Sequence, residues 1–287
     1  MRVKSPKARA SRTLVLRHSL LVRIAHWTNV LCLTVLLLSG LQIFNAHPRL
    51  YWGNTGADAD PAILSLQANN NDGVLRGITQ IGSLSFETTG LLGVSTVDGE
   101  PAARGFPAWI TLPSYQDLAT GRRWHFFFAW LFVINGLAYL AHASLTHHLR
   151  RDLLPNKAEL SLSHLGREIA DHVRLRFPKG EKARHYNTLQ KITYLIVIFL
   201  LLPGMVLTGL SMSPGVNAYA PGLPDLFGGR QSARTVHFLV ANGLVAFVIV
   251  HLAMVLASGF FNNIRSMITG RYGIETARLP PDLGASP

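Results

Sequence analysis

The stretch VHFLVANGLVAFVIVHLAMVLASGFF, residues 236–261, decides the fold because it is long, apolar and free of charged residues. About 20 consecutive apolar residues cross the hydrocarbon core of a bilayer as a helix, so this stretch predicts a transmembrane helix. It nevertheless contains two ionisable residues, His237 and His251. Polar groups at membrane depth are costly and usually face a partner or a cofactor.

Three further stretches are long and apolar enough to span a membrane, namely residues 24–44, 124–145 and 192–212. The four stretches together predict an all-α integral membrane protein, a four-helix transmembrane bundle. The membrane domain is expected to cover residues 1–272, and residues 273–287 are expected to form a flexible tail. The third span contains Pro203-Gly204, which should kink the helix.

The composition agrees with a membrane protein and excludes other classes. Only 15% of the residues are charged, whereas about a quarter are charged in soluble domains. The net charge of +12 could suggest nucleic-acid binding, but the basic residues flank the apolar spans, so we expect contact with membrane lipid and no nucleic acid. Cys32 is the only cysteine, which excludes an intrachain disulfide and a thiolate-held iron–sulfur cluster.

Lysine and arginine positions predict the orientation. Twenty lie in the N-terminal lead, the connection between the second and third spans and the C-terminal tail, and seven lie on the other side. Both termini and the basic connection are therefore expected in the cytoplasm, at a bacterial inner membrane. The loop 45–121 is expected in the periplasm, as a small cap on the membrane. The connection should contain one or two amphipathic helices.

The histidines of the spans match in depth. His237 and His251 are 14 residues apart, so at about 100° and 1.5 Å per residue they face the same way near opposite membrane surfaces. This geometry suits two stacked haems that each take one axial ligand from this helix. Pairing by depth gives His125 with His237 on an outer haem, and His26 with His251 on an inner haem.

Two alternatives stay open. His142 at the inner end of the second span could replace His26, although it lies about 100° away from the face of His125. A haem-free transporter that uses its histidines as proton relays is the second alternative, and the matched depths favour haem over it.

An arginine precedes three of these histidines by three residues, on the same helix face and one turn nearer to water. Guanidinium groups pair well with carboxylates, so these arginines are predicted to bind haem propionates: Arg23, Arg122 and Arg234. Snorkelling at a helix end explains Arg23 equally well. Gly40 and Gly136 lie near the histidine stripes and could form a shallow wall for a flat macrocycle, with ordinary helix packing as the alternative.

The strings RIAHW (residues 23–27) and LSGLQIF (residues 38–44) resemble the first helix of the bacterial cytochrome b561/Ni-hydrogenase b-type cytochrome family. The resemblance extends from about residue 17 to residue 272. Three segments are similar to the thiosulfate-reductase-type cytochrome b branch, namely residues 42–52, 121–128 and 228–238. The long outer loop departs from the compact family pattern.

The resemblance implies a di-haem b-type cytochrome, with two haem b groups, that acts as an electron-transfer subunit. Family members of this type commonly exchange electrons between the quinone pool and a periplasmic molybdopterin oxidoreductase or a hydrogenase. His47, at the outer surface, is a candidate for lining a quinone or partner site. The alternative within the same fold is a standalone quinone-linked oxidoreductase, such as a superoxide oxidase.

Overall fold

The computed structural model describes residues 11–147, 149, 153–174 and 187–276. His148 and His185 of the basic connection and residues 277–287 of the expected tail lie outside the described residues. The chain divides into two compact units. Unit 1 comprises residues 1–25, 139–196 and 248–287, and unit 2 comprises residues 26–138 and 197–247.

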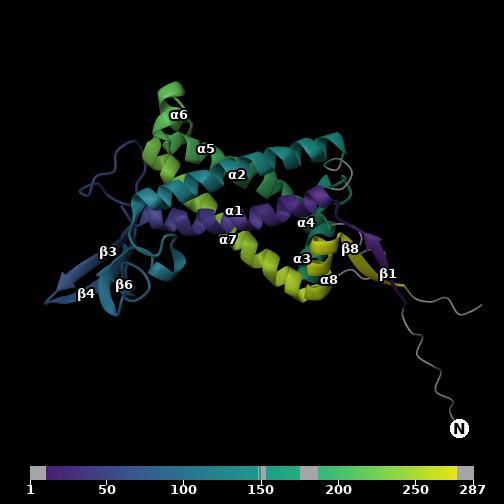
Figure 1. Ribbon diagram of the computed structural model, residues 1–287, viewed down its shortest axis with the longest axis horizontal. Helices are drawn as coiled ribbons and strands as arrows, with labels where there is room; N and C mark the ends of the chain where they lie inside the picture. Colours follow the sequence, from purple (N-terminus) through teal and green to yellow (C-terminus); the bar gives the residue numbers. More distant parts are fainter. Residues whose placement is uncertain (1–10, 148, 150–152, 175–186, 277–287) are drawn as a thin grey trace, which may run out of the picture. The chain divides into compact units, whose positions relative to one another are not determined.

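Four helical segments are long and apolar enough to cross a membrane, as the sequence predicts (Figure 1). They are α1 (Leu20–Phe44), α2 (Leu118–Leu145), a third segment over Thr188–Met212, and α7 (Arg230–Ala257). Each helix begins four to six residues before the predicted span. The physical reason is that a helix continues past the apolar core into the polar interface, where apolarity no longer marks it.

The third span is irregular, in agreement with the predicted kink. It consists of α4 (Thr188–Ile196), a π-helical turn (Val197–Leu201) and α5 (Leu202–Met212). Pro203 lacks a backbone N–H, so the helix ahead of it loses a regular hydrogen bond and widens. Two short helices follow, α6 (Pro214–Tyr219) and a 3-10 turn (Pro224–Phe227).

The C-terminal end differs from the prediction in two ways. The fourth span ends at Ala257 rather than at residue 261, because Gly259 has a φ of 116° and breaks the helix before α8 (Phe260–Thr269). Residues 273–276 are not a free tail. They belong to β8 (Arg271–Thr276), which pairs antiparallel with β1 (Ser11–Leu16) in unit 1, with Leu14 opposite Gly273.

Unit 1 also contains the amphipathic helix expected in the basic connection, α3 (Leu162–Val173). The Glu168 carboxylate of α3 accepts the backbone N–H groups of Thr188 and Leu189, at 3.2 and 3.0 Å. These are the first amides of α4, which have no partner inside their own helix. The carboxylate thus caps the start of the third span, where negative charge is favourable.

The loop 45–121 of unit 2 is a β-structured cap, which corrects the all-α prediction for this part of the chain. Four strands form an antiparallel sheet in the order β2 (Arg49–Leu50), β3 (Leu64–Asn71), β4 (Val74–Ile81) and β5 (Leu84–Glu87). A separate hairpin pairs β6 (Val94–Val97) with β7 (Glu100–Ala103), and a 3-10 turn (Ala108–Ile110) follows. Figure 1 shows β3, β4 and β6 near the same end of α1.

The cap is joined to the membrane helices of unit 2 by apolar packing and by backbone hydrogen bonds. Phe44, Leu50 and Leu66 form a buried cluster against which Phe106 and Phe238 pack. The carbonyl of Gly53 accepts the backbone N–H groups of Gln231 and Ser232, at 3.0 and 3.1 Å, in the first turn of α7. Thr235 Oγ1 donates to the Tyr51 carbonyl at 2.6 Å. The helix that carries His237 therefore starts on the cap.

Candidate functional site

His125 of α2 is held by a hydroxyl group of α1. Ser39 Oγ lies 3.1 Å from His125 Nδ1 and donates its own proton to the Val35 carbonyl, 2.6 Å away. Because the hydroxyl proton is used within the helix, Oγ accepts the hydrogen bond and Nδ1 carries the proton. Nε2 of His125 is then left with a free lone pair, which is the form of imidazole that binds a metal.

The same arrangement recurs at His237 of α7. Thr208 Oγ1, on α5, lies 2.9 Å from His237 Nδ1 and donates to the Gly204 carbonyl at 2.6 Å. Nδ1 of His237 is therefore also the protonated nitrogen, and Nε2 carries the lone pair. Ser39 and Thr208 are both fully buried. Sequence reasoning missed these two hydroxyl residues.

A glycine follows each hydroxyl residue and lets the imidazole approach the helix backbone. A Cβ at Gly40 would lie 3.3 Å from His125 Cε1, and a Cβ at Gly209 would lie 3.5 Å from His237 Cε1. The predicted role of Gly40 and Gly136 as a wall for a macrocycle stays a prediction; a Cβ at Gly136 would have no described neighbour within 4 Å. Gly40 and Gly209 are thus the glycines that shape this site.

The two imidazoles face each other at the spacing that a bis-imidazole iron requires. Their ring centres are 6.3 Å apart, with an angle of 60° between the ring planes. A metal–imidazole bond is about 2 Å long and the ring centre lies about 1 Å beyond the nitrogen, so two imidazoles on one metal have centres about 6 Å apart. His125 and His237 therefore fit one iron of a haem.

The surroundings of the pair are apolar. Cys32 of α1 and Phe128 and Phe132 of α2 form a buried cluster, with leucines and valines of α1, α2 and α5 packed against it. Farther along the same helices, Asn135 Nδ2 donates to Asn29 Oδ1 at 2.8 Å, so these two amides satisfy each other. Apolar walls exclude water and lower the dielectric constant around a redox centre.

The predicted inner pair is divided between the two units. His26 belongs to unit 2, where its ring makes an edge contact with Trp27 at 5.4 Å between ring centres. His251 and the alternative ligand His142 belong to unit 1. The assignment of the inner ligands stays a prediction.

The three arginines that are predicted to bind propionates differ in their contacts and in their exposure. Arg23, in unit 1, donates to the Ile268 carbonyl. Arg122 is exposed and lies over the ring of Phe126, 5.6 Å from its centre. Arg234 donates to the His47 carbonyl and lies 5.3 Å from the centre of the Phe44 ring. Arg234 is therefore the one of the three that is held inside unit 2 near the outer pair.

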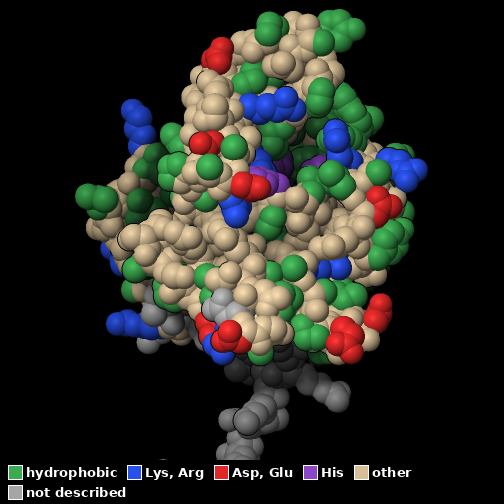
Figure 2. Space-filling model, turned by 90° about the vertical axis from the view of Figure 1, so that its left-hand side faces the viewer, with side chains coloured by type: hydrophobic (Ala, Val, Ile, Leu, Met, Phe, Trp, Pro, Cys, Tyr) green, Lys and Arg blue, Asp and Glu red, His purple; other side chains and the backbone are tan. Residues whose placement is uncertain are grey.

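His47 lies beneath the cap surface. Its Nε2 lies 3.0 Å from the Tyr51 hydroxyl, and its Nδ1 lies 3.9 Å from Asp58 Oδ1. Burial and the positive charge of Arg234 lower the pKa of His47, although Asp58 opposes this shift. On the face shown in Figure 2, histidine side chains lie at the base of a hollow that acidic and basic side chains border.

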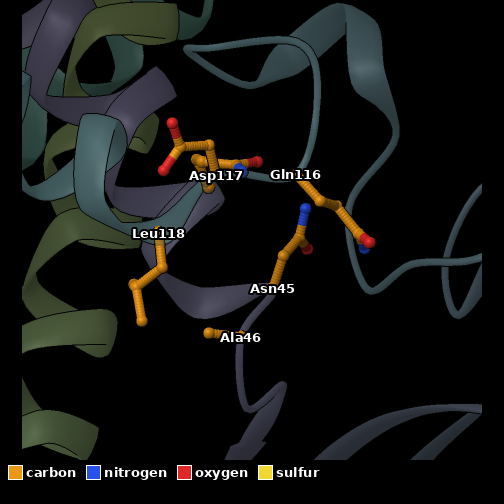
Figure 3. Close-up of a pocket in the computed structure, with 6 residues that line it drawn as sticks. Asn45, Ala46, Gln116, Asp117 and Leu118 are labelled. Carbon is orange, nitrogen blue, oxygen red and sulfur yellow. The ribbon is translucent and has the colours of Figure 1, made fainter.

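A second polar region lies where α1 ends and α2 begins. A shallow depression of about 290 Å³ is lined by residues of both helix ends: Gln42, Asn45, Ala46, Gln116, Asp117 and Leu118 (Figure 3). Hydrogen bonds from the side chain and backbone of Thr120 lower the pKa of the Asp117 carboxyl. Beneath it, the Gln42 amide donates to the Tyr115 carbonyl at 2.9 Å.

Comparisons with known proteins identify the family of the chain. A family model described as prokaryotic cytochrome b561 matches residues 17–270 of the chain, which include all four predicted ligand histidines. A curated protein from Azospira oryzae, named putative protein-methionine-sulfoxide reductase subunit YedZ1, is 36% identical over 149 residues. The alignment covers 52% of this chain and 70% of that relative.

Proposed function

The chain belongs to the prokaryotic cytochrome b561 family, and on this premise we propose that it is a di-haem membrane subunit that relays electrons between quinone and a periplasmic redox partner. One observation supports the outer site most directly. His125 and His237 face each other with ring centres 6.3 Å apart, and each Nδ1 is bound by a buried hydroxyl group. The inner ligands are proposed to be His26 and His251, with His142 as the alternative to His26.

The chain prepares the site, and haem supplies the one-electron chemistry. Ser39 and Thr208 hold the Nδ1 protons, so the Nε2 lone pair of each ring remains available to bind iron. Such partners of a metal-bound histidine fix the ring orientation and raise the basicity of the ligand. Phe128 and Phe132 keep water away. Arg234 provides positive charge one helical turn before His237.

The partner is proposed from the relative and from the family. The relative is named as a subunit of a protein-methionine-sulfoxide reductase. We therefore place a periplasmic molybdopterin oxidoreductase first among the possible partners and a hydrogenase-type subunit second. The excess of lysine and arginine on one side of the spans favours cytoplasmic termini and a periplasmic cap, on which such a partner would dock.

The test is a spectrum of the purified full chain with a haem-to-protein ratio. We expect two low-spin b haems for each chain. His237→Ala should remove the outer haem and leave the inner one, and His251→Ala should do the reverse. His47→Ala is the matched control and should keep both. A colourless protein, or two intact haem signals in His237→Ala, would refute the ligand assignment.

A further inference from the structure

Arg104 of the cap is a buried guanidinium that is bound only by neutral groups. It follows β7 and is 4% exposed. Its Nε donates to the Phe106 carbonyl at 3.0 Å, and its Nη2 donates to Gln42 Oε1 at 3.0 Å and to Thr111 Oγ1 at 2.6 Å. Among the described parts of the chain, no Asp or Glu side chain forms an ion pair with it.

A buried cation of this kind favours the binding of an anion. Moving a charge out of water carries one of the largest penalties in a protein, and neutral acceptors offset only part of it. Burial accordingly lowers the pKa of the Arg104 guanidinium. The Nη1 group makes no hydrogen bond to another described residue, so two of its five N–H donors are available to a ligand.

Arg104 lies one helical turn from the outer site, on the cap side. Its partner Gln42 follows Ser39 by three residues on the same face of α1, and Ser39 holds His125. On α2, Gly121 precedes His125 by four residues, and a Cβ at Gly121 would lie 3.0 Å from Gln42 Cγ. The Gln42 side chain thus links Arg104 to the turn above His125.

Arg234 holds the corresponding position on the other ligand helix. It precedes His237 by three residues, and its guanidinium donates to the His47 carbonyl. Two guanidinium groups without carboxylate partners therefore lie on the cap side of the two imidazoles. A haem carries two propionates, and a guanidinium N–H forms a strong charge-assisted hydrogen bond to a carboxylate oxygen.

We infer that Arg104 of the cap, and not Arg122 of α2, binds a propionate of the outer haem and that Arg234 binds the other. This inference rests on the proposed outer haem site. The spacing of arginine and histidine in α2 points to Arg122, but that side chain is exposed and lies over the Phe126 ring. The cap therefore completes the cofactor site.

A redox titration of the full-length haem protein tests the inference. In Arg104→Met, loss of one positive charge near the iron should shift the ferric–ferrous equilibrium of the outer haem towards ferric by on the order of tenfold. For a one-electron couple, a tenfold shift lowers the potential by about 59 mV. Arg122→Met is the matched control and should change the equilibrium less than about twofold. The inner haem serves as the internal reference.

A purely structural role gives a different result. If Arg104 only bridges Gln42 and Thr111, Arg104→Met lowers the melting temperature and leaves the infrared bands of the outer haem propionates unchanged, which overturns the inference. An unchanged outer potential overturns it as well. An equal or larger shift in Arg122→Met overturns it too.

A second variant covers the case in which Arg104→Met does not fold. Arg104→Lys keeps the charge but loses the planar pair of donors. With haem labelled by 13C at the propionates, the infrared carboxylate bands of the outer haem should shift in this variant, and unchanged bands overturn the inference. A failure of the proposed function is visible separately, because the wild-type protein would then show no low-spin bis-imidazole haem.

Discussion

Replacing Thr208 with valine removes the hydroxyl that holds the His237 imidazole and keeps the shape of the side chain. Two hydrogen bonds disappear, one donated to the Gly204 carbonyl and one accepted from His237 Nδ1. The Gly204 carbonyl keeps its position in the helix ladder. The Nδ1 proton, in contrast, loses the hydroxyl and keeps only the Met205 carbonyl as an acceptor in a water-poor site.

Because the Met205 carbonyl remains, the cost of an unsatisfied buried donor is the upper limit of the effect. That cost is about 1–3 kcal/mol, which corresponds to a roughly 5- to 150-fold weaker hold on the outer haem. Loss of an outer partner of a metal-bound histidine typically costs about 10- to 100-fold in affinity, which lies in the same range. A less basic imidazole also favours ferrous iron, so the outer potential should rise.

The assay is transfer of haem from the detergent-solubilised protein to excess apomyoglobin, followed together with a redox titration. Thr34→Val is the matched control, because Thr34 Oγ1 donates to the Val30 carbonyl at 2.8 Å in the same way but meets no histidine. Thr208→Ser keeps the hydroxyl and should behave like the wild type. If Thr208→Val holds the outer haem as firmly as Thr34→Val and at an unchanged potential, the hydroxyl does not position the imidazole.

Three further predictions follow from the same contacts. Gly40→Ala places a Cβ 3.3 Å from His125 Cε1 and should lower the outer haem content several-fold, whereas Gly136→Ala should not lower it. A pyridine haemochrome assay measures the haem content, and equal contents in the two variants would contradict this prediction. His125→Ala should remove the same haem as His237→Ala, so the double variant should lose no more than either single one. The folded protein lowers the pKa of His47, mainly through burial, so its stability should fall as the pH drops below the ordinary value of 6.5. His47→Gln should flatten this decline in melting temperature. An unchanged pH profile in the variant would speak against a contribution from His47.

The four spans could be predicted because length and apolarity along one dimension are sufficient signals for a membrane helix. The pairing of His125 with His237 could be proposed from depth alone. Thr208 was missed because the third span has no histidine and was not expected to serve one, and Ser39 was noticed only as part of a string that resembles the family. The available signal was a repeated string, Leu-Ser-Gly-Leu at 38–41 and Leu-Thr-Gly-Leu at 207–210.

The cap could not be predicted in the same way. Asp72-Gly73 is a two-residue turn with positive φ at both positions and joins β3 to β4, so a hairpin signal was present in the sequence. The hydrogen bonds of Arg104 could not be predicted from the sequence, because its contact with Gln42 joins residues 62 positions apart. Such a contact exists only once the cap has folded against α1.

The cap and the start of α7 have to be engineered together, because backbone groups of Gly53 and Tyr51 contact the first turns of that helix. A loop that supplies the missing acceptors of a helix end cannot be shortened without exposing those amides at the membrane surface. Chimeras with compact relatives would therefore have to exchange residues 47–56 and the first turn of α7 as one block. A graft that separates them would loosen His237, the proposed iron ligand, farther along the same helix.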